Sequence, residues 1–408
     1  MIKQTQTKLF DFSDTDLNFC AGSKALFPSV FKKVLANGYN DKTVSSVSVS
    51  DSSVTLTYGV NHGYVADRVL QVTATGGYSK EVYIDSVTTN TVTFTESTTT
   101  GLSGTISTKV AALGWTLAYE SGLVQLYKMK YLDERDLYVR FVFSATGARK
   151  NVMNVCVGKT ANTSTGVITD ANAFDAHKAN VNVVTGFEWM FDYTTTTGID
   201  SYTYSQGLST FGKGLIIGSK YHLVLMCNGG FTNYCGRVHA IAPTAMLNYE
   251  KLDYPLVFGQ YNTTALNATS GADFCQLKLT SSGVGSAAYV GAIPVSFDQE
   301  PNIDSVITGV TQNVSSFLTS NLEQFNTTSA LPISLYEKAS KQFVGFTAGG
   351  LYRIEIKDTN TSLSISATPS ITTDIDFSNH VAQHFAWVSS ADVYIHGFVA
   401  PVEEIKIA

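Results

Sequence analysis

Short runs in which apolar and polar residues alternate recur along most of the chain, and they constrain its fold more than any other feature. Side chains of a β-strand point alternately to its two faces, so a period of two predicts strands with one buried face. The clearest runs are 47–60, 69–74, 81–87, 91–95, 113–129 and 138–145. Turn signals such as Gly76-Gly77 and Ser121-Gly122 separate them. We therefore expect an all-β protein with several β-sandwich or small-barrel units.

The composition agrees with this expectation. Hydrophobic residues make up 44% of the 408 residues, whereas charged residues make up only 15%, against roughly 25% in ordinary globular domains. Thr, Ser, Asn and Gly fill the polar positions instead, and they suit pleated surfaces and tight turns better than exposed helices.

Two segments show the spacing of three and four residues that is typical of helices. The first is a short N-terminal cluster with Pro28 in its first turn, formed by Leu26, Phe27, Val30, Phe31, Val34 and Leu35. The second is 303–325, which could form a helix or, equally, two strands. Together with boundary signals at Gly101 and Gly104, these patterns predict three units, at 1–108, 109–298 and 299–408.

The apolar stripe of the N-terminal cluster needs a partner surface, because a helix of about ten residues is marginal alone in water. Either the middle unit or another subunit must supply that surface. The second alternative makes Phe27, Val30, Phe31 and Val34 candidate interface residues.

Charge and cysteine content exclude several classes of protein. The net charge of −6 without any basic run argues against a nucleic-acid partner. Five scattered cysteines form a poor disulfide framework and suggest buried thiols made in a reducing cytosol. No segment has the apolar length of a signal peptide or a membrane span, so we expect a soluble chain that is not exported.

No residue pattern predicts a catalytic or metal site. His222, Cys227, Cys235 and His239 are suitable zinc ligands, but their spacing fits two neighbouring strands with buried thiols better than a zinc knuckle. His380 and His384 could bind a metal only on a helix, and a third ligand is not evident. Asp374 and Asp376 are most simply a solvated face. We therefore expect no enzyme activity and no cofactor.

Several stretches, taken in order, resemble virion structural proteins of contractile-tailed bacteriophages. Among them are GWTLAYESGLVQLYKM (114–129), RDLYVRFVF (135–143), KGLIIGSKYHLVLMC (213–227), YCGRVHAI (234–241), DYPLVFGQ (253–260) and FVGFTAGGLYRIEI (343–356), together with a small β-module at 61–95. The resemblance implies a component of the tail, baseplate or neck and collar, synthesised in the cytoplasm of the host bacterium. It also implies that the chain is a homo-oligomer that packs against other phage virion proteins.

Two other functions remain open at this point. One is a receptor-binding or carbohydrate-binding tail fibre, in which exposed Tyr and Trp would stack on sugars. The other is a polysaccharide-degrading enzyme, which would need two acidic side chains in a cleft. The chain has neither the long repetitive shaft expected of a fibre nor an evident acidic pair.

Overall fold

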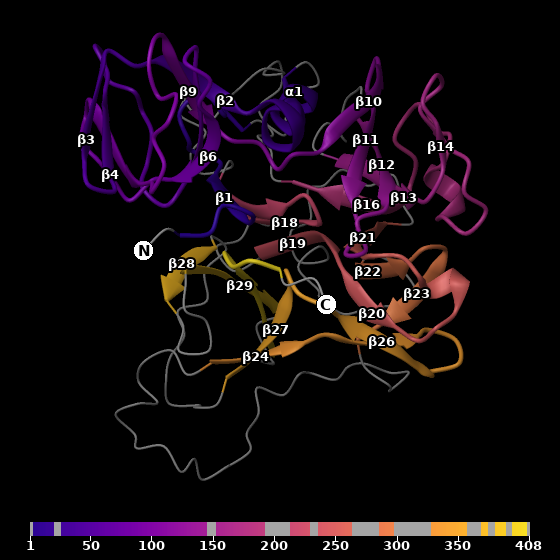
Figure 1. The fold of residues 1–408 in the computed structure, drawn as a ribbon. Coiled ribbons are helices and arrows are strands. Elements are labelled where there is room, and N and C mark those ends of the chain that lie inside the picture. The colour runs from indigo at the N-terminus through magenta and orange to yellow at the C-terminus, as the bar shows by residue number, and fades with distance from the viewer. Residues whose placement is uncertain are drawn as a thin grey trace, which may run out of the picture.

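The computed structural model is mostly β, with 51% strand in several antiparallel sheets and 7% helix (Figure 1). This confirms the predicted all-β fold. The structure describes residues 3–19, 26–144, 152–191, 213–228, 236–262, 285–297, 328–356, 369–373, 380–388 and 394–405. The helix considered at 303–325 lies outside these ranges.

Residues 39–110 form a small β-module of two four-stranded sheets, ordered β2-β9-β5-β6 and β3-β4-β8-β7. The strands are β2 (Tyr39–Thr43), β3 (Ser46–Ser50), β4 (Ser53–Thr57), β5 (Val69–Ala74), β6 (Ser79–Tyr83), β7 (Ser86–Val87), β8 (Thr91–Thr95) and β9 (Ile106–Val110). Leu56 and Phe94 are fully buried in the module, whereas the hydroxyls of Thr55 and Thr93 lie 3.1 Å apart on the opposite face. The apolar residues that alternate with polar ones in the sequence therefore form the core of the module.

The predicted N-terminal helix is present as α1 (Phe27–Lys32), followed by the π-type turn η1 (Lys33–Asn37). Pro28 occupies its first turn, where the missing proline N–H would have no intrahelical partner in any case. Figure 1 shows the helix between the β-module and the strands of the body.

The stripe of this helix is covered by its own chain. Phe27, Val30, Phe31 and Val34 are only 1–3% exposed. The ring of Phe27 lies 5.5 Å from that of Phe143 in an edge-on arrangement, which is favourable for aromatic pairs. These four residues are therefore part of the chain's own core and have almost no exposed surface for another subunit. This fits the alternative in which the middle unit supplies the partner surface for the helix.

The body is a branched sheet of fifteen strands. One path runs β10-β11-β12-β13-β16-β21-β22-β23-β25-β26-β20, and a branch runs from β21 through β19, β18 and β17 to β1. The bounds along the path are β10 (Thr116–Ser121), β11 (Val124–Lys130), β12 (Asp136–Phe143), β13 (Val152–Gly158), β16 (Gly186–Met190), β21 (Leu256–Asn262), β22 (Gly285–Val290), β23 (Ile293–Ser296), β25 (Ser334–Glu337), β26 (Phe343–Thr347) and β20 (Thr244–Met246). Those in the branch are β19 (Gly236–Ala242), β18 (His222–Asn228), β17 (Gly214–Ser219) and β1 (Lys8–Asp11).

The sheet divides at β21, where one edge pairs first with β19 and then with β16. Gly259 lies at the division, and a Cβ there would come within 2.6 Å of the Trp189 ring. The Trp189 indole N–H also donates to the Phe258 carbonyl at 2.9 Å. A large ring thus fills the space where β19 and β16 diverge, and only glycine permits it.

Strands β17, β18 and β19 are buried on both faces. Leu223 and Leu225 point into one core cluster, with the helix and β12, whereas Val224 and Met226 point into a second, with the C-terminal strands. This explains why the sequence of these strands is almost continuously apolar rather than alternating.

The last sheet has the order β24-β27-β30-β29-β28. Its strands are β24 (Thr328–Pro332), β27 (Tyr352–Ile356), β28 (Ser370–Thr373), β29 (His380–Val388) and β30 (Tyr394–Pro401). It covers the second core, where the rings of Phe398 and Phe258 are 5.6 Å apart. The central strands are therefore enclosed between two other layers.

Hydrogen bonding crosses both of the predicted domain boundaries. β1, which precedes the β-module, pairs with β17 in the body, and β25 pairs with β23 across residue 298. The division into three domains, at 1–108, 109–298 and 299–408, therefore stays a prediction. Hydrogen-bonded sheets connect the three units.

Residues 3–11, here called the N-terminal tie, contact three separate regions of the described structure. Beyond the β1–β17 pairing, the Lys8 ammonium lies 3.0 Å from the Glu81 carboxylate of the β-module. The Gln4 side-chain amide donates to the Val402 carbonyl at 3.1 Å, and the Ile405 amide donates to Gln6 at 2.7 Å. A short segment thus joins the β-module, the body and the C-terminal strand region.

Candidate functional site

The zinc-type residues do not converge. Cys227 points into the same core cluster as Leu225, whereas His222, five residues earlier on β18, lies on the face of Val224 and Met226. Cys235 lies outside the described residues. Among those that are described, no three His, Cys, Asp or Glu side chains are close enough to hold a metal ion.

The two histidines of this set are fully buried. The Nδ1 of His222 lies 2.9 Å from the Ser219 hydroxyl, and the Nε2 of His239 lies 2.7 Å from the Met190 carbonyl. Burial lowers the pKa of each imidazole to about 3. Both rings are therefore neutral at pH 7 and serve as packing groups, His239 by stacking on Trp189 with ring centroids 5.6 Å apart.

The remaining candidate pairs add no site within the described residues. His380 and His384 lie on strand β29 rather than on a helix. Four residues along a strand span about 13 Å, too far for two backbone positions to present one metal site as they would on a helix. Asp374 and Asp376 lie outside the described residues.

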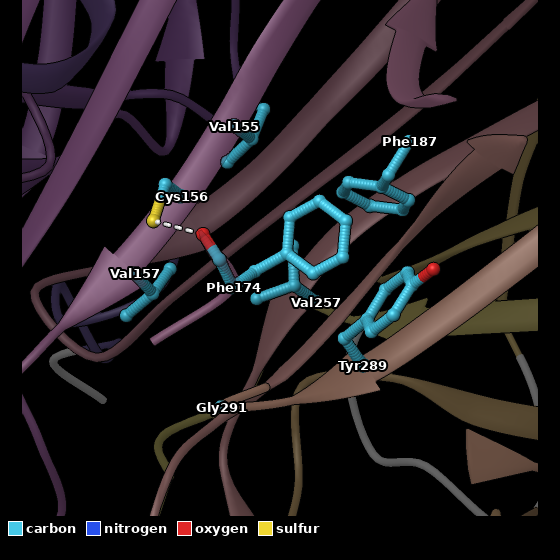
Figure 2. Close-up of a pocket in the computed structure, with 8 residues that line it drawn as sticks. All are labelled: Val155, Cys156, Val157, Phe174, Phe187, Val257, Tyr289 and Gly291. Carbon is cyan, nitrogen blue, oxygen red and sulfur yellow. Dashed lines mark hydrogen bonds between the residues drawn. The ribbon is translucent and has the colours of Figure 1, made fainter. Parts of the chain in front are cut away.

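A small pocket lies between β13, β21 and β22 (Figure 2). Its lining is apolar and aromatic, formed by Val155, Cys156, Val157, Phe174, Phe187, Val257, Tyr289 and Gly291. Figure 2 shows the rings of Phe174, Phe187 and Tyr289 turned toward one another, and the first and last have centroids 4.4 Å apart. The space left is enough for about one water molecule, so this is a packing void rather than a ligand site.

Cys156, beside this void, is not a reactive thiol. Its Sγ lies 3.4 Å from the Phe174 carbonyl, to which it donates a hydrogen bond (Figure 2). Complete burial raises the pKa of the thiol to about 12. A nucleophilic cysteine needs a lowered pKa, so the environment of Cys156 works against catalysis.

An exposed apolar surface lies on one side of β20, β26 and β25. The strands β20 and β26 are at the lower right of Figure 1. We call this surface the β26 face and define it as Ala245, Leu247, Tyr336, Phe343 and Phe346. Leu247 is 55% exposed, Phe343 44% and Phe346 43%. Register places Ala245 directly opposite Phe346 and Tyr336 opposite Phe343, with those two rings 5.7 Å apart.

A β-bulge puts both phenylalanines on this face. In a regular strand Phe343 and Phe346, three residues apart, would point to opposite sides. The register of β26 against β25 shifts between Leu335 and Tyr336. Val344 therefore points into the core with Leu335, while both rings point outward.

Glycine is required at this bulge. Gly345 has a φ of 152°, which side chains with a Cβ rarely adopt, and an added Cβ would lie 2.4 Å from the Ala245 carbonyl oxygen. The sequence contains the signal, because an isolated glycine inside a strand pattern suggests a bulge. Periodicity alone predicts an ordinary strand for FVGF (343–346) and does not predict that Phe343 and Phe346 are both exposed.

Comparisons with models of protein families, with curated proteins and with solved structures found no match for this chain. In the part of the chain that the structure describes, no helix has the length and apolar character to cross a membrane. The β26 face is thus the candidate site on which a function can be argued.

Proposed function

We propose that this chain is a structural component of a bacteriophage virion, located in the tail, baseplate or neck and collar. It acts by packing against copies of itself and other virion proteins, and the proposal assigns it no catalytic step. The observation that supports this most is the β26 face, where a glycine bulge turns two phenylalanines into solvent.

Exposing these rings has a cost that a contact would recover. Burying the exposed half of a phenylalanine side chain releases about 1–2 kcal/mol, at roughly 25 cal/mol per Å² of apolar surface. The five residues of the β26 face would then contribute a few kcal/mol, which suits a weak contact. In a particle with many repeated contacts, weak contacts add up to stable attachment.

The layered body also suits a virion component. The central strands are enclosed by apolar surface on both faces, and the low charge content of 15% leaves much uncharged surface for contacts between proteins. Such a fold would be durable outside a cell, where a protein is not replaced.

Analysis of purified particles tests the proposal. Mass spectrometry should find the chain at a fixed ratio to other virion proteins. Antibody labelling of intact particles, viewed by electron microscopy, should place it at one position in the tail, baseplate or neck. A chain that is abundant in infected cells but absent from purified particles would contradict the proposal.

A further inference from the structure

We infer that the occupant of the β26 face is a second copy of this chain, related to the first by a two-fold axis. This inference rests on the proposed function and names the partner of the same surface. Three features of the described residues carry it: an uncharged centre, a self-complementary relief and a rim with both signs of charge.

The residues that form the centre of the face include no Asp, Glu, Lys, Arg or His. β20, β26 and β25 contribute Ala245, Leu247, Phe343, Phe346 and Tyr336, with Ser334 beside them. A partner recognised mainly by its charge would require charged groups here. An apolar centre with a tyrosine fits instead another apolar and aromatic surface, such as the same face of a second copy.

The relief of the face fits a two-fold contact. Phe346 has Ala245 opposite it on β20 and Ser334 opposite it on β25. A large ring therefore lies between two small residues. In a two-fold contact, if residue i of one copy meets residue j of the other, then j also meets i. An axis between Phe346 and its small neighbours would therefore place the ring of each copy over the small residues of the other.

The rim carries both signs of charge. Glu337 and Lys341 lie at the turn between β25 and β26. Glu337 remains ionised because hydrogen bonds from Ser340 and the Ala339 amide lower its pKa. Two copies can thus place acids against lysines, whereas a rim of one sign would repel its own copy.

Sedimentation of the purified full chain over a range of concentrations tests this inference. The wild type should associate in a concentration-dependent manner, and added salt should weaken the association only slightly, because salt screens the charges of the rim but not the apolar centre. Phe343→Glu and Phe346→Glu should each weaken it at least about tenfold, because a carboxylate would be buried without a partner. Ala245→Arg should do the same by filling the recess beside Phe346.

Val60→Glu is the matched control, because Val60 is 63% exposed and lies in the β-module, away from the β26 face in Figure 1. It should associate like the wild type. Circular dichroism should show that all variants are folded, as expected for changes at exposed positions.

The other outcomes separate the inference from the proposed function. A wild type that stays monomeric, with face variants that no longer enter particles, would mean that another virion protein covers the face, which overturns only the inference. Association unchanged in all face variants would also overturn it. If immobilised host polysaccharide retains the wild type but not the face variants, the occupant of the face is a sugar and the inference is wrong. If the chain is absent from particles, the proposed function itself is wrong.

Discussion

Arg140 is a buried cation that donates its hydrogen bonds to neutral oxygens. Its guanidinium donates to the carbonyls of Gly166 at 2.7 Å, His177 at 3.2 Å and Asn180 at 2.6 Å. All three acceptor residues lie in the connection between β13 and β16, which contains β14 (Ala161–Asn162), β15 (Val167–Ile168) and η3 (Asp175–His177). The Arg140 side chain therefore holds this connection against β12.

Arg140→Met should lower the free energy of unfolding by about 3 kcal/mol, since buried carbonyls would lose their donor. Urea unfolding followed by tryptophan fluorescence measures this. Arg135→Met is the control, because the Arg135 side chain is 30% exposed and its ion pair with Asp253 contributes only about 1 kcal/mol in such a setting. Equal losses in the two variants would contradict this role of Arg140.

His222 and His239 predict an acid dependence of stability. Their pKa values fall from 6.5 to about 3 on folding, through desolvation, so the unfolded chain binds more protons between these limits. Stability is then full above about pH 6.5 and decreases as the pH falls toward 3, by up to about 1.4 kcal/mol per pH unit for each histidine.

Replacing His222 with Gln removes one of these titrating groups. Urea unfolding at several pH values between 4 and 7 should show a shallower pH dependence in the variant, by about one proton. An unchanged slope would show that His222 does not titrate in this range.

At the scale of elements, the bulge in β26 decides whether the exposed face exists. Gly345→Ala should destabilise the protein by about 1–3 kcal/mol, because the new methyl group meets the Ala245 carbonyl oxygen. Gly122→Ala is the control, since Gly122 also has a positive φ, of 56°, but nothing lies within 4 Å of an added Cβ. Thermal unfolding of both variants should show the larger loss at Gly345, and a larger loss at Gly122 would count against the steric argument.

The strands and the short helix were predictable because their signals are local. Alternation identifies β4 and β8 within a few residues, and Pro28 marks the start of α1. β1 was not predictable, since its four residues, KLFD, are too few to show a period. Gly345 signals the bulge in β26, but the exposure of Phe343 and Phe346 was not predictable, because it also depends on the pairing of β26 with β20, which is distant in sequence.

At the scale of the whole molecule, the N-terminal tie connects both cores. Leu9 points into the cluster shared with the C-terminal strands, and Phe10 into the cluster shared with the helix. The sequence predicted separate units because a local pattern cannot show that β1 pairs with β17. Hydrogen bonds between strands therefore cross the predicted boundaries after residues 108 and 298.

Leu9→Ala and Phe10→Ala should each lower the free energy of unfolding by about 2–5 kcal/mol, the range for cavities in packed cores. Val49→Ala, at a position 48% exposed, should change it by less than about 0.5 kcal/mol. Chemical denaturation measures all three. If the tie variants unfold like the wild type, the segment does not hold the layers together.

The tie also has a consequence for synthesis on the ribosome. Gln4 and its partner Val402 are 398 positions apart, and at about 5–20 residues per second that distance takes roughly 20–80 s to translate. During this interval Leu9 has emerged while the C-terminal strands that share its core cluster do not yet exist. The β-module, whose strands are adjacent in sequence, can fold in that time, but the central layer has to wait. Nascent chains are therefore expected to need protection from aggregation until translation has passed β30.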